Sequence, residues 1–247
     1  MEFKKVDRVP IWESFWPETV LKWSEHLHKL KQISIHEYLG IDLKFRFPRI
    51  APQIDTIKII REDTREIIYR NEWGCVVKVI RGQNLPGYLE FPIKTFRDLE
   101  KYKFVSAQDL RRYQKVGAEF DASDESVLLD DMRLIFGPRS FEEETLSNRS
   151  YCLFGGVLGP FESMWRMRGM NNLLIDMKLD SGFVHALAAR VTGYMIEVGI
   201  TQIEKYNLPG IWIADDVSYE KGMFFSLNFI MSLFFLFYKR CVSNLRN

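Results

Sequence analysis

The chain is poor in the features that mark secreted, metal-binding and nucleic-acid-binding proteins. Its three cysteines, Cys75, Cys152 and Cys241, show no C-x-x-C spacing, which argues against a disulfide scaffold and favours a reducing compartment. Lys and Arg number 34 against 33 for Asp and Glu, so there is no strong field to attract nucleic acid or an anionic membrane. Residues 1–7 lack the apolar run of a signal peptide. We therefore expect a cytoplasmic protein with no nucleic-acid partner.

Histidine is equally scarce, and the familiar catalytic motifs are missing. The four histidines are His26, His28, His36 and His185; the first two are two positions apart and do not share a helix face. There is no H-x-C or H-E-x-x-H motif, so we expect no metal site in this chain. The absence of a G-x-G-x-x-G turn, a Walker loop and G-x-S-x-G leaves nucleotide binding and serine hydrolysis unsupported.

One long apolar stretch, Met223 to Tyr238, lies near the end of the chain. It is shorter than the roughly 20 residues that cross a bilayer, and Asn228 interrupts it. We therefore expect no membrane anchor.

The first half of the chain combines short apolar runs with an amphipathic pattern. Residues 9–12 form an apolar run typical of a buried strand. Spacings of three and four residues predict a helix across residues 16–30. Residues 56–80 are rich in β-branched side chains and predict an antiparallel meander, and residues 95–120 are charged and mostly helical in pattern.

The second half has the pattern of a parallel α/β protein. A short strand, residues 151–154, is expected to end at a Gly155-Gly156 turn, followed by a helix that starts at Phe161. A second amphipathic helix covers residues 184–198, and the Asn-Leu-Pro-Gly sequence at 207–210 ends it. Residues 211–214 then predict a buried strand that ends in an acidic pair.

That acidic pair, Asp215 and Asp216, is the sharpest candidate for catalysis. Side chains alternate along a strand, so only one of the two carboxylates is expected to point inward. The inward one could orient a substrate or act as a base. Alternatively, both could cap a helix N-terminus, where Asp is favoured. Spacing alone does not decide between the two.

Five further residues are candidates for substrate binding, each with a structural alternative. Gly155 and Gly156 would let backbone approach a ligand, or would form a tight turn. Glu13 and Trp16 could form a carboxylate in an aromatic pocket, where desolvation would raise the pKa of Glu13, or Glu13 could be solvated at a helix start. Arg168 could pair with an acidic ligand, or with a carboxylate of the chain itself.

Several segments together resemble the uroporphyrinogen decarboxylase superfamily, which includes the cobamide-dependent methyltransferases. The resemblance is carried by an opening strand, a strand with its glycine turn, the helix after it, an acidic strand end and the segment that follows: residues 8–13, 153–162, 168–177, 210–216 and 222–226.

The resemblance implies an α/β fold of the (β/α)8 TIM-barrel type, preceded by a helical and antiparallel β-meander region. Residues 1–226 would form an incomplete, C-terminally truncated barrel, and residues 227–247 a divergent Phe-rich tail. An open parallel sheet would expose an unpaired edge, so we expect a homo-oligomer or a partner that covers it.

The resemblance also suggests the chemistry. The corrinoid-dependent branch moves methyl between a corrinoid, often carried by a corrinoid protein, and a small acceptor, with zinc. This chain lacks the H-x-C motif of that branch, so it would be inactive or impaired. One alternative is a decarboxylase of porphyrin biosynthesis, although residues 13–19 lack the arginines that hold the porphyrinogen. Another is a non-catalytic remnant that binds a partner.

Overall fold

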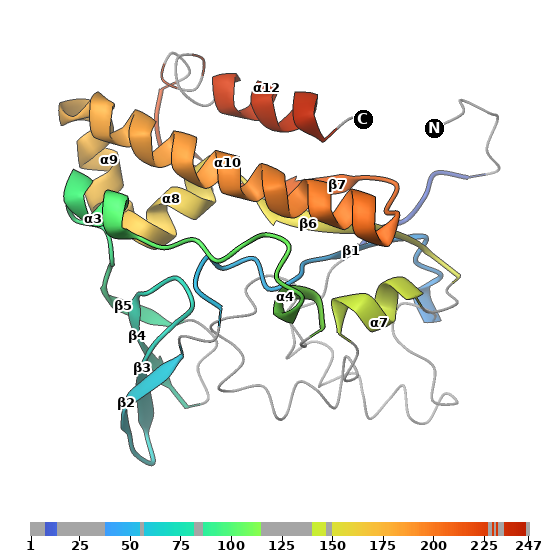
Figure 1. Ribbon diagram of the computed structural model, residues 1–247, viewed down its shortest axis with the longest axis horizontal. Helices are drawn as coiled ribbons and strands as arrows, with labels where there is room; N and C mark the ends of the chain where they lie inside the picture. The colour runs from blue at the N-terminus through green and yellow to red at the C-terminus, as the bar shows by residue number, and fades with distance from the viewer. Residues whose placement is uncertain are drawn as a thin grey trace.

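The fold is mixed α/β, with a parallel and an antiparallel sheet joined by helices (Figure 1). The computed structural model describes residues 8–13, 38–54, 57–81, 86–114, 140–146, 150–226, 229, 231 and 235–245. The helix predicted across residues 16–30 lies outside these ranges.

The parallel sheet contains β1 (Leu43–Arg46), β6 (Cys152–Leu158) and β7 (Ile211–Ala214) in the order β1-β6-β7. Both pairs are parallel, so the carboxyl ends of the three strands share one edge. The α/β class is thus confirmed. The described strands form open sheets and not a closed barrel, and the parallel sheet has three of them.

The apolar run at residues 9–12 is not a buried strand, which corrects the prediction. Val9 is 81% exposed, and Ile11 and Trp12 are exposed as well. The carbonyl of Ile11 accepts the backbone N–H groups of Asp42 and Leu43, so the run touches the start of β1 without a ladder of its own.

Three consecutive helices follow β6: α8 (Pro160–Arg168), α9 (Met170–Leu179) and α10 (Ser181–Tyr206). α8 has Pro160 at its first position, where a missing N–H costs nothing. Asp180 caps α10 by accepting the N–H of Phe183, and Asn207, with φ of 50°, ends it in the left-handed conformation. The predicted helix over 184–198 is therefore confirmed and is longer at both ends. In Figure 1, α10 crosses one face of the parallel sheet.

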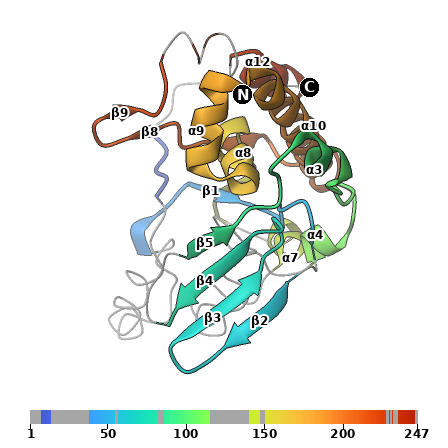
Figure 2. The same cartoon turned by 90° about the vertical axis from the view of Figure 1, so that its left-hand side faces the viewer.

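The predicted meander is confirmed as an antiparallel sheet that projects from the helices (Figure 2). It contains β2 (Lys58–Glu62), β3 (Glu66–Arg70), β4 (Val76–Ile80) and one further strand, β5 (Gly87–Glu90). Alternate residues of β3, Ile67 and Tyr69, are buried, as expected for a strand with one face on a core. Every residue of the edge strand β2 is exposed.

One hydrophobic core joins the antiparallel sheet to α8 and α10. Trp73 and Val77 pack in the same cluster as Met164 and Leu187, and all four side chains are fully buried. The thiol of Cys75 donates to the carbonyl of Arg166 at 2.8 Å. Burial of these apolar side chains stabilises the contact between the two halves.

Three short helices lie between the antiparallel sheet and β6 in sequence: α3 (Phe96–Lys101), α4 (Arg111–Gln114) and α7 (Phe141–Leu146). α4 packs against α7, and α7 contacts α10. Thr95 and Asp98 form a capping box at the start of α3. The helical pattern over 95–120 is thus confirmed for α3 and α4, whereas residues 102–110 connect them without a helix and residues 115–120 lie outside the described ranges.

Arg112, in α4, is completely buried and binds backbone carbonyls. Its guanidinium donates to the carbonyl of Arg49 and to that of Ala51, each at 2.7 Å. It also donates to the carbonyls of Pro52, Val105 and Ser106. The hydroxyl of Tyr194, in α10, reaches the carbonyls of Ile50 and Ala51 as well, each at 3.3 Å.

Glu144 joins α7 to β1 through buried charges. Its carboxylate lies 2.9 Å from Lys44 Nζ and 3.2 Å from Arg46 Nε, and it accepts the hydroxyl of Tyr151 at 2.9 Å. Burial alone would raise the pKa of Glu144, but the charges of Arg46 and Lys44 outweigh it and hold that pKa below its ordinary value.

The last elements are a small hairpin, β8 (Ser218–Tyr219) with β9 (Gly222–Met223), and the helix α12 (Phe235–Asn244). α12 lies along α10 on the side away from the parallel sheet's strands (Figure 1). Within the ranges that the structure describes, none of the helices is long and apolar enough to span a bilayer.

Candidate functional site

The carboxyl edge of the parallel sheet brings together the end of β6, the end of β7 and the first turn of α8. The backbone N–H of Gly159, after β6, donates to the carbonyl of Ala214 at 2.7 Å. Asp215, the residue after Ala214, therefore lies directly beside the start of α8. In parallel α/β proteins this edge is where functional groups gather.

Asp215 turns toward α8 and caps it. Its carboxylate accepts the backbone N–H of Glu162 at 2.6 Å and that of Phe161 at 3.1 Å. These are N–H groups that a helix leaves without a partner in its first turn, where negative charge is also favoured by the helix dipole. The capped helix is the one after β6, so the cap crosses between neighbouring strands.

Gly159 leaves the space that Asp215 occupies. A Cβ at Gly159 would lie 2.3 Å from Asp215 Oδ2. Any larger residue there would displace the carboxylate from the helix.

The hydroxyl of Tyr238, in α12, donates a short hydrogen bond to Asp215 Oδ2. Asp215 is largely enclosed, and this burial raises its pKa from 3.8 to about 6, although the hydrogen bonds from Tyr238 and from α8 act in the opposite direction. The carboxyl group is thus able to exchange a proton near neutral pH, which is the range useful for acid–base chemistry.

Asp216, next in sequence, is exposed. The two carboxylates therefore have different environments, as the alternation along the strand predicted: Asp215 caps α8, which is its structural alternative, and Asp216 is exposed. The structure brings Asp215 to the site and leaves Asp216 at its rim.

A second carboxylate, Glu162, lies in the same turn of α8. It accepts the indole N–H of Trp165 at 2.7 Å and pairs with Arg166, whose Nη2 lies 2.7 Å from Glu162 Oε1. Arg166 also donates to the hydroxyl of Tyr88, in β5, at 3.1 Å. The negative charge of Glu162 contributes to the raised pKa of Asp215. Glu162 was not among the site residues predicted from the sequence, although its place in the first helical turn after a strand was a usable signal.

Aromatic rings enclose the first turn of α8. The ring centroid of Phe161 lies 5.1 Å from that of Phe225 and 5.7 Å from that of Phe224. Tyr219 stacks on Phe224 in turn at 5.5 Å. The rings of Tyr219, Phe224 and Phe225 belong to the segment that follows β7, so they pack that segment against α8.

Gly155 and Gly156 lie inside β6, so the turn predicted at this pair is wrong. A Cβ at Gly155 would lie 2.3 Å from Gln202 Oε1, and one at Gly156 would lie 2.6 Å from the ring of Phe47. Gln202 accepts the N–H of Gly156 at 3.0 Å and donates to its carbonyl at 3.1 Å. The pair lets a helix and a ring pack closely against the middle of the sheet.

Arg168 follows its structural alternative. It forms a two-point ion pair with Asp176, with donor–acceptor distances of 2.6 and 3.2 Å, and donates to the carbonyl of Lys94 at 3.1 Å. Its guanidinium lies over the ring of Phe183. These contacts tie α8 to α9 and to the start of α3.

Glu13 is exposed, and Trp16 lies outside the described residues. The aromatic residue that reaches the sheet is instead Trp12, whose ring lies 5.0 Å from that of Phe45 and 5.1 Å from that of Trp212. Phe154 completes this group at 5.6 Å from Phe45. We call Trp12, Phe45, Phe154 and Trp212 the aromatic face. It lies on the side of the parallel sheet opposite to Gly155 and Gln202, because side chains alternate along β6.

Metal binding finds no support in the ranges described here. They hold no group of three or more His, Cys, Asp or Glu side chains placed to bind one ion. Cys75 and Cys241 are buried and Cys152 is exposed, and each is a free thiol.

Comparison with known proteins gives one informative likeness. No family model matches the chain, and no curated protein matches its sequence. Among solved structures, a methyltransferase from Methanosarcina mazei superposes with a TM-score of 0.52 at 12% sequence identity. The match covers 98% of this chain and 64% of that protein, so the chain spans less than two thirds of its length. At this identity the likeness concerns the fold.

Proposed function

We propose that the chain belongs with the methyltransferases of the uroporphyrinogen decarboxylase superfamily and takes part in methyl transfer between a corrinoid and a small acceptor. The observation that carries the proposal is Asp215, a desolvated carboxyl group at the carboxyl edge of a parallel sheet. Its setting is a fold that resembles a methyltransferase over 98% of the chain. The segments that resemble the superfamily in sequence include the acidic strand end itself.

The described residues offer a surface for a corrinoid but no donor set for zinc. The aromatic face presents partly exposed, planar side chains, which suit the broad ring of a corrin. The described residues do not group into a zinc site, and the chain contains no H-x-C motif. We therefore assign no step to zinc and propose that this chain alone binds a corrinoid with little or no methyl transfer.

In this proposal Asp215 has a proton-handling role. With a pKa of about 6, its carboxyl group can gain or lose a proton near neutral pH. α8 holds the carboxylate in place through the N–H groups of Phe161 and Glu162. A corrinoid, when bound, would supply the methyl group or receive it.

The test is equilibrium dialysis of the purified chain against methylcobalamin, followed by the absorbance change of methylcobalamin in the presence of a thiol. We expect retention of methylcobalamin, weakened by Trp12→Ala, and little demethylation. Leu146→Ala, at an exposed site on α7, is the matched control. A folded chain that retains no methylcobalamin contradicts the proposal. Formation of coproporphyrinogen from uroporphyrinogen would favour the decarboxylase instead.

A further inference from the structure

The helix α12 has two faces of different character. Its inner face packs against the body of the protein, with Cys241 only 2% exposed and Tyr238 bonded to Asp215. Its outer face is apolar and open: Phe235, Leu236 and Val242 are 49%, 59% and 42% exposed. Large apolar side chains that remain open on one helix face are a sign of a surface that binds something.

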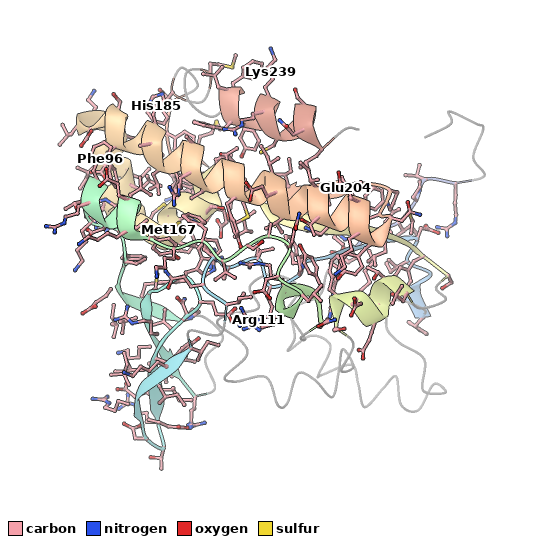
Figure 3. The ribbon with its side chains drawn as sticks, viewed as in Figure 1. Phe96, Arg111, Met167, His185, Glu204 and Lys239 are labelled. Carbon is pink, nitrogen blue, oxygen red and sulfur yellow. The ribbon has the colours of Figure 1, made fainter. Side chains whose placement is uncertain are left out.

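A basic side chain shares this outer face. Lys239 is exposed, and its side chain points away from α10 in Figure 3. Arg240 is exposed as well, but its guanidinium reaches α10, where a Cβ at Gly193 would lie 3.9 Å from it. At 100° per residue, Phe235, Lys239 and Val242 fall within an arc of roughly 60°. We call Phe235, Leu236, Lys239 and Val242 the α12 outer face.

The charge of this part of the chain is one-sided. Residues 221–247 contain Lys221, Lys239, Arg240 and Arg246, and no Asp or Glu. The chain as a whole is nearly neutral, at +1, so this segment is balanced by acidic residues elsewhere in the sequence. Within the described part of the chain, Lys239 and Arg240 form no ion pair with a carboxylate.

We infer that the α12 outer face docks in the plane of an anionic lipid surface. A helix with large apolar side chains beside Lys and Arg suits the boundary between lipid headgroups and acyl chains. Phe235 and Leu236 would enter that boundary, while the long stem of Lys239 would carry its charge to the phosphates. The absence of carboxylates from residues 221–247 removes the repulsion that an anionic surface would otherwise meet.

This mode of binding agrees with the length of the helix. α12 has 10 residues, which is too short to cross a bilayer but long enough to lie along its surface. The inference is independent of the proposed function, since no residue of the α12 outer face lies at the sheet edge.

The test is flotation of the full chain with two kinds of vesicle, phosphatidylcholine alone and phosphatidylcholine with phosphatidylserine. We expect binding to the second kind that weakens as salt is added. The double variant K239Q/R240Q should bind about 30-fold more weakly, the loss expected for two basic residues near such a surface. The double variant F235S/L236S should lose binding.

A matched control replaces two apolar side chains that are equally open but lie on the antiparallel sheet. Ile60 and Leu89 are 54% and 51% exposed, and I60S/L89S should bind vesicles like the unchanged chain. Circular dichroism of each variant verifies that the fold is kept.

Three outcomes would overturn the inference. Equal binding to both kinds of vesicle would remove the role of charge, and unchanged binding by F235S/L236S would place the contact elsewhere. Absence of vesicle binding, together with self-association that F235S/L236S abolishes, would assign the face to a second copy of the chain.

Discussion

The carboxylate of Asp215 caps a helix that does not follow its own strand: it accepts the N–H of Glu162, 53 residues earlier, at 2.6 Å. β7 is thereby fixed to α8 by a charge-assisted hydrogen bond as well as by the ladder to β6. The same carboxylate receives the hydroxyl of Tyr238, so three segments distant in sequence meet at one side chain.

The first prediction concerns pH. The pKa of Asp215 is raised from 3.8 to about 6 by burial, so the folded state favours the protonated carboxyl. The protonated Asp215 therefore contributes fully to the free energy of unfolding below about pH 4. This contribution falls as the pH rises from about 4 to about 6, and above that the free energy no longer changes with the titration of Asp215. The whole change is at most about 3 kcal/mol, from 1.36 kcal/mol per pKa unit. The free energy of unfolding in urea, compared between the chain and Asp215→Asn from pH 4 to 8, measures it.

In that comparison, the advantage of the unchanged chain over Asp215→Asn should shrink as pH rises. Asp216→Asn serves as the control because that side chain is exposed. A difference between the chain and Asp215→Asn that stays constant across this range would show that Asp215 is not desolvated in solution.

The second prediction concerns the packing of β6. Gly156→Ala would place a Cβ 2.6 Å from the ring of Phe47, so we expect a loss of about 1–3 kcal/mol in unfolding free energy, typical of overpacking. Adding Phe47→Leu should recover part of that loss, which a double-mutant cycle by urea denaturation would reveal. Gly182→Ala is the control, since its Cβ would meet nothing nearer than 3.7 Å. Strict additivity of the two changes would contradict this contact.

The third prediction concerns Arg112, whose planar guanidinium serves five backbone carbonyls. Arg112→Lys keeps the charge but cannot reproduce that geometry, and it leaves buried carbonyls without a donor. We expect a cost of about 2–4 kcal/mol, measured by thermal and urea denaturation. Arg111→Lys, at the exposed neighbouring position, should change stability by less than about 0.5 kcal/mol. Equal effects of the two changes would argue against the buried contacts.

The fourth prediction concerns Glu144, which lies between Lys44 and Arg46 and is 3% exposed. Glu144→Gln would leave two largely buried cations without their carboxylate, at a cost of about 3 kcal/mol near pH 7. Because the folded pKa is lowered, the contribution of Glu144 is present above its unfolded pKa and is lost as pH falls through the folded value. The variant should therefore approach the unchanged chain in stability as the solution is acidified, which urea denaturation from pH 7 to pH 3 would show.

The second half of the fold was readable from local patterns, because its helices and strands carry their own start and stop signals. Pro160 marks the start of α8, and the sequence Asn207 to Gly210 marks the end of α10. The alternation of side chains also predicted that Asp215 and Asp216 would have different environments.

The role of the glycine pair could not be read locally, because the reasons for it lie far away in the chain. Gly156 is required by Phe47, more than one hundred residues earlier, and Gly155 by Gln202, which lies on α10. A local pattern detects glycine and indicates a turn, whereas the sheet needs it for close packing.

The partners of the candidate site were hidden for the same reason. Tyr238 lies 23 residues beyond Asp215, within an almost wholly apolar stretch. The composition of that stretch does not indicate which of its residues contacts Asp215. The catalytic role of Asp215 and Asp216 and the binding roles of Glu13, Trp16, Gly155, Gly156 and Arg168 stay predictions.

The buried carbonyls of residues 49–52 have a consequence for synthesis on the ribosome. One of their donors, Arg112, follows about sixty residues later, and the other, Tyr194, lies 143 residues after Ala51. At ordinary rates of translation, an interval on the order of ten seconds separates the emergence of Ala51 from that of Tyr194. During that interval the segment must remain hydrated, so its final burial waits for α10 and belongs to the late steps of folding.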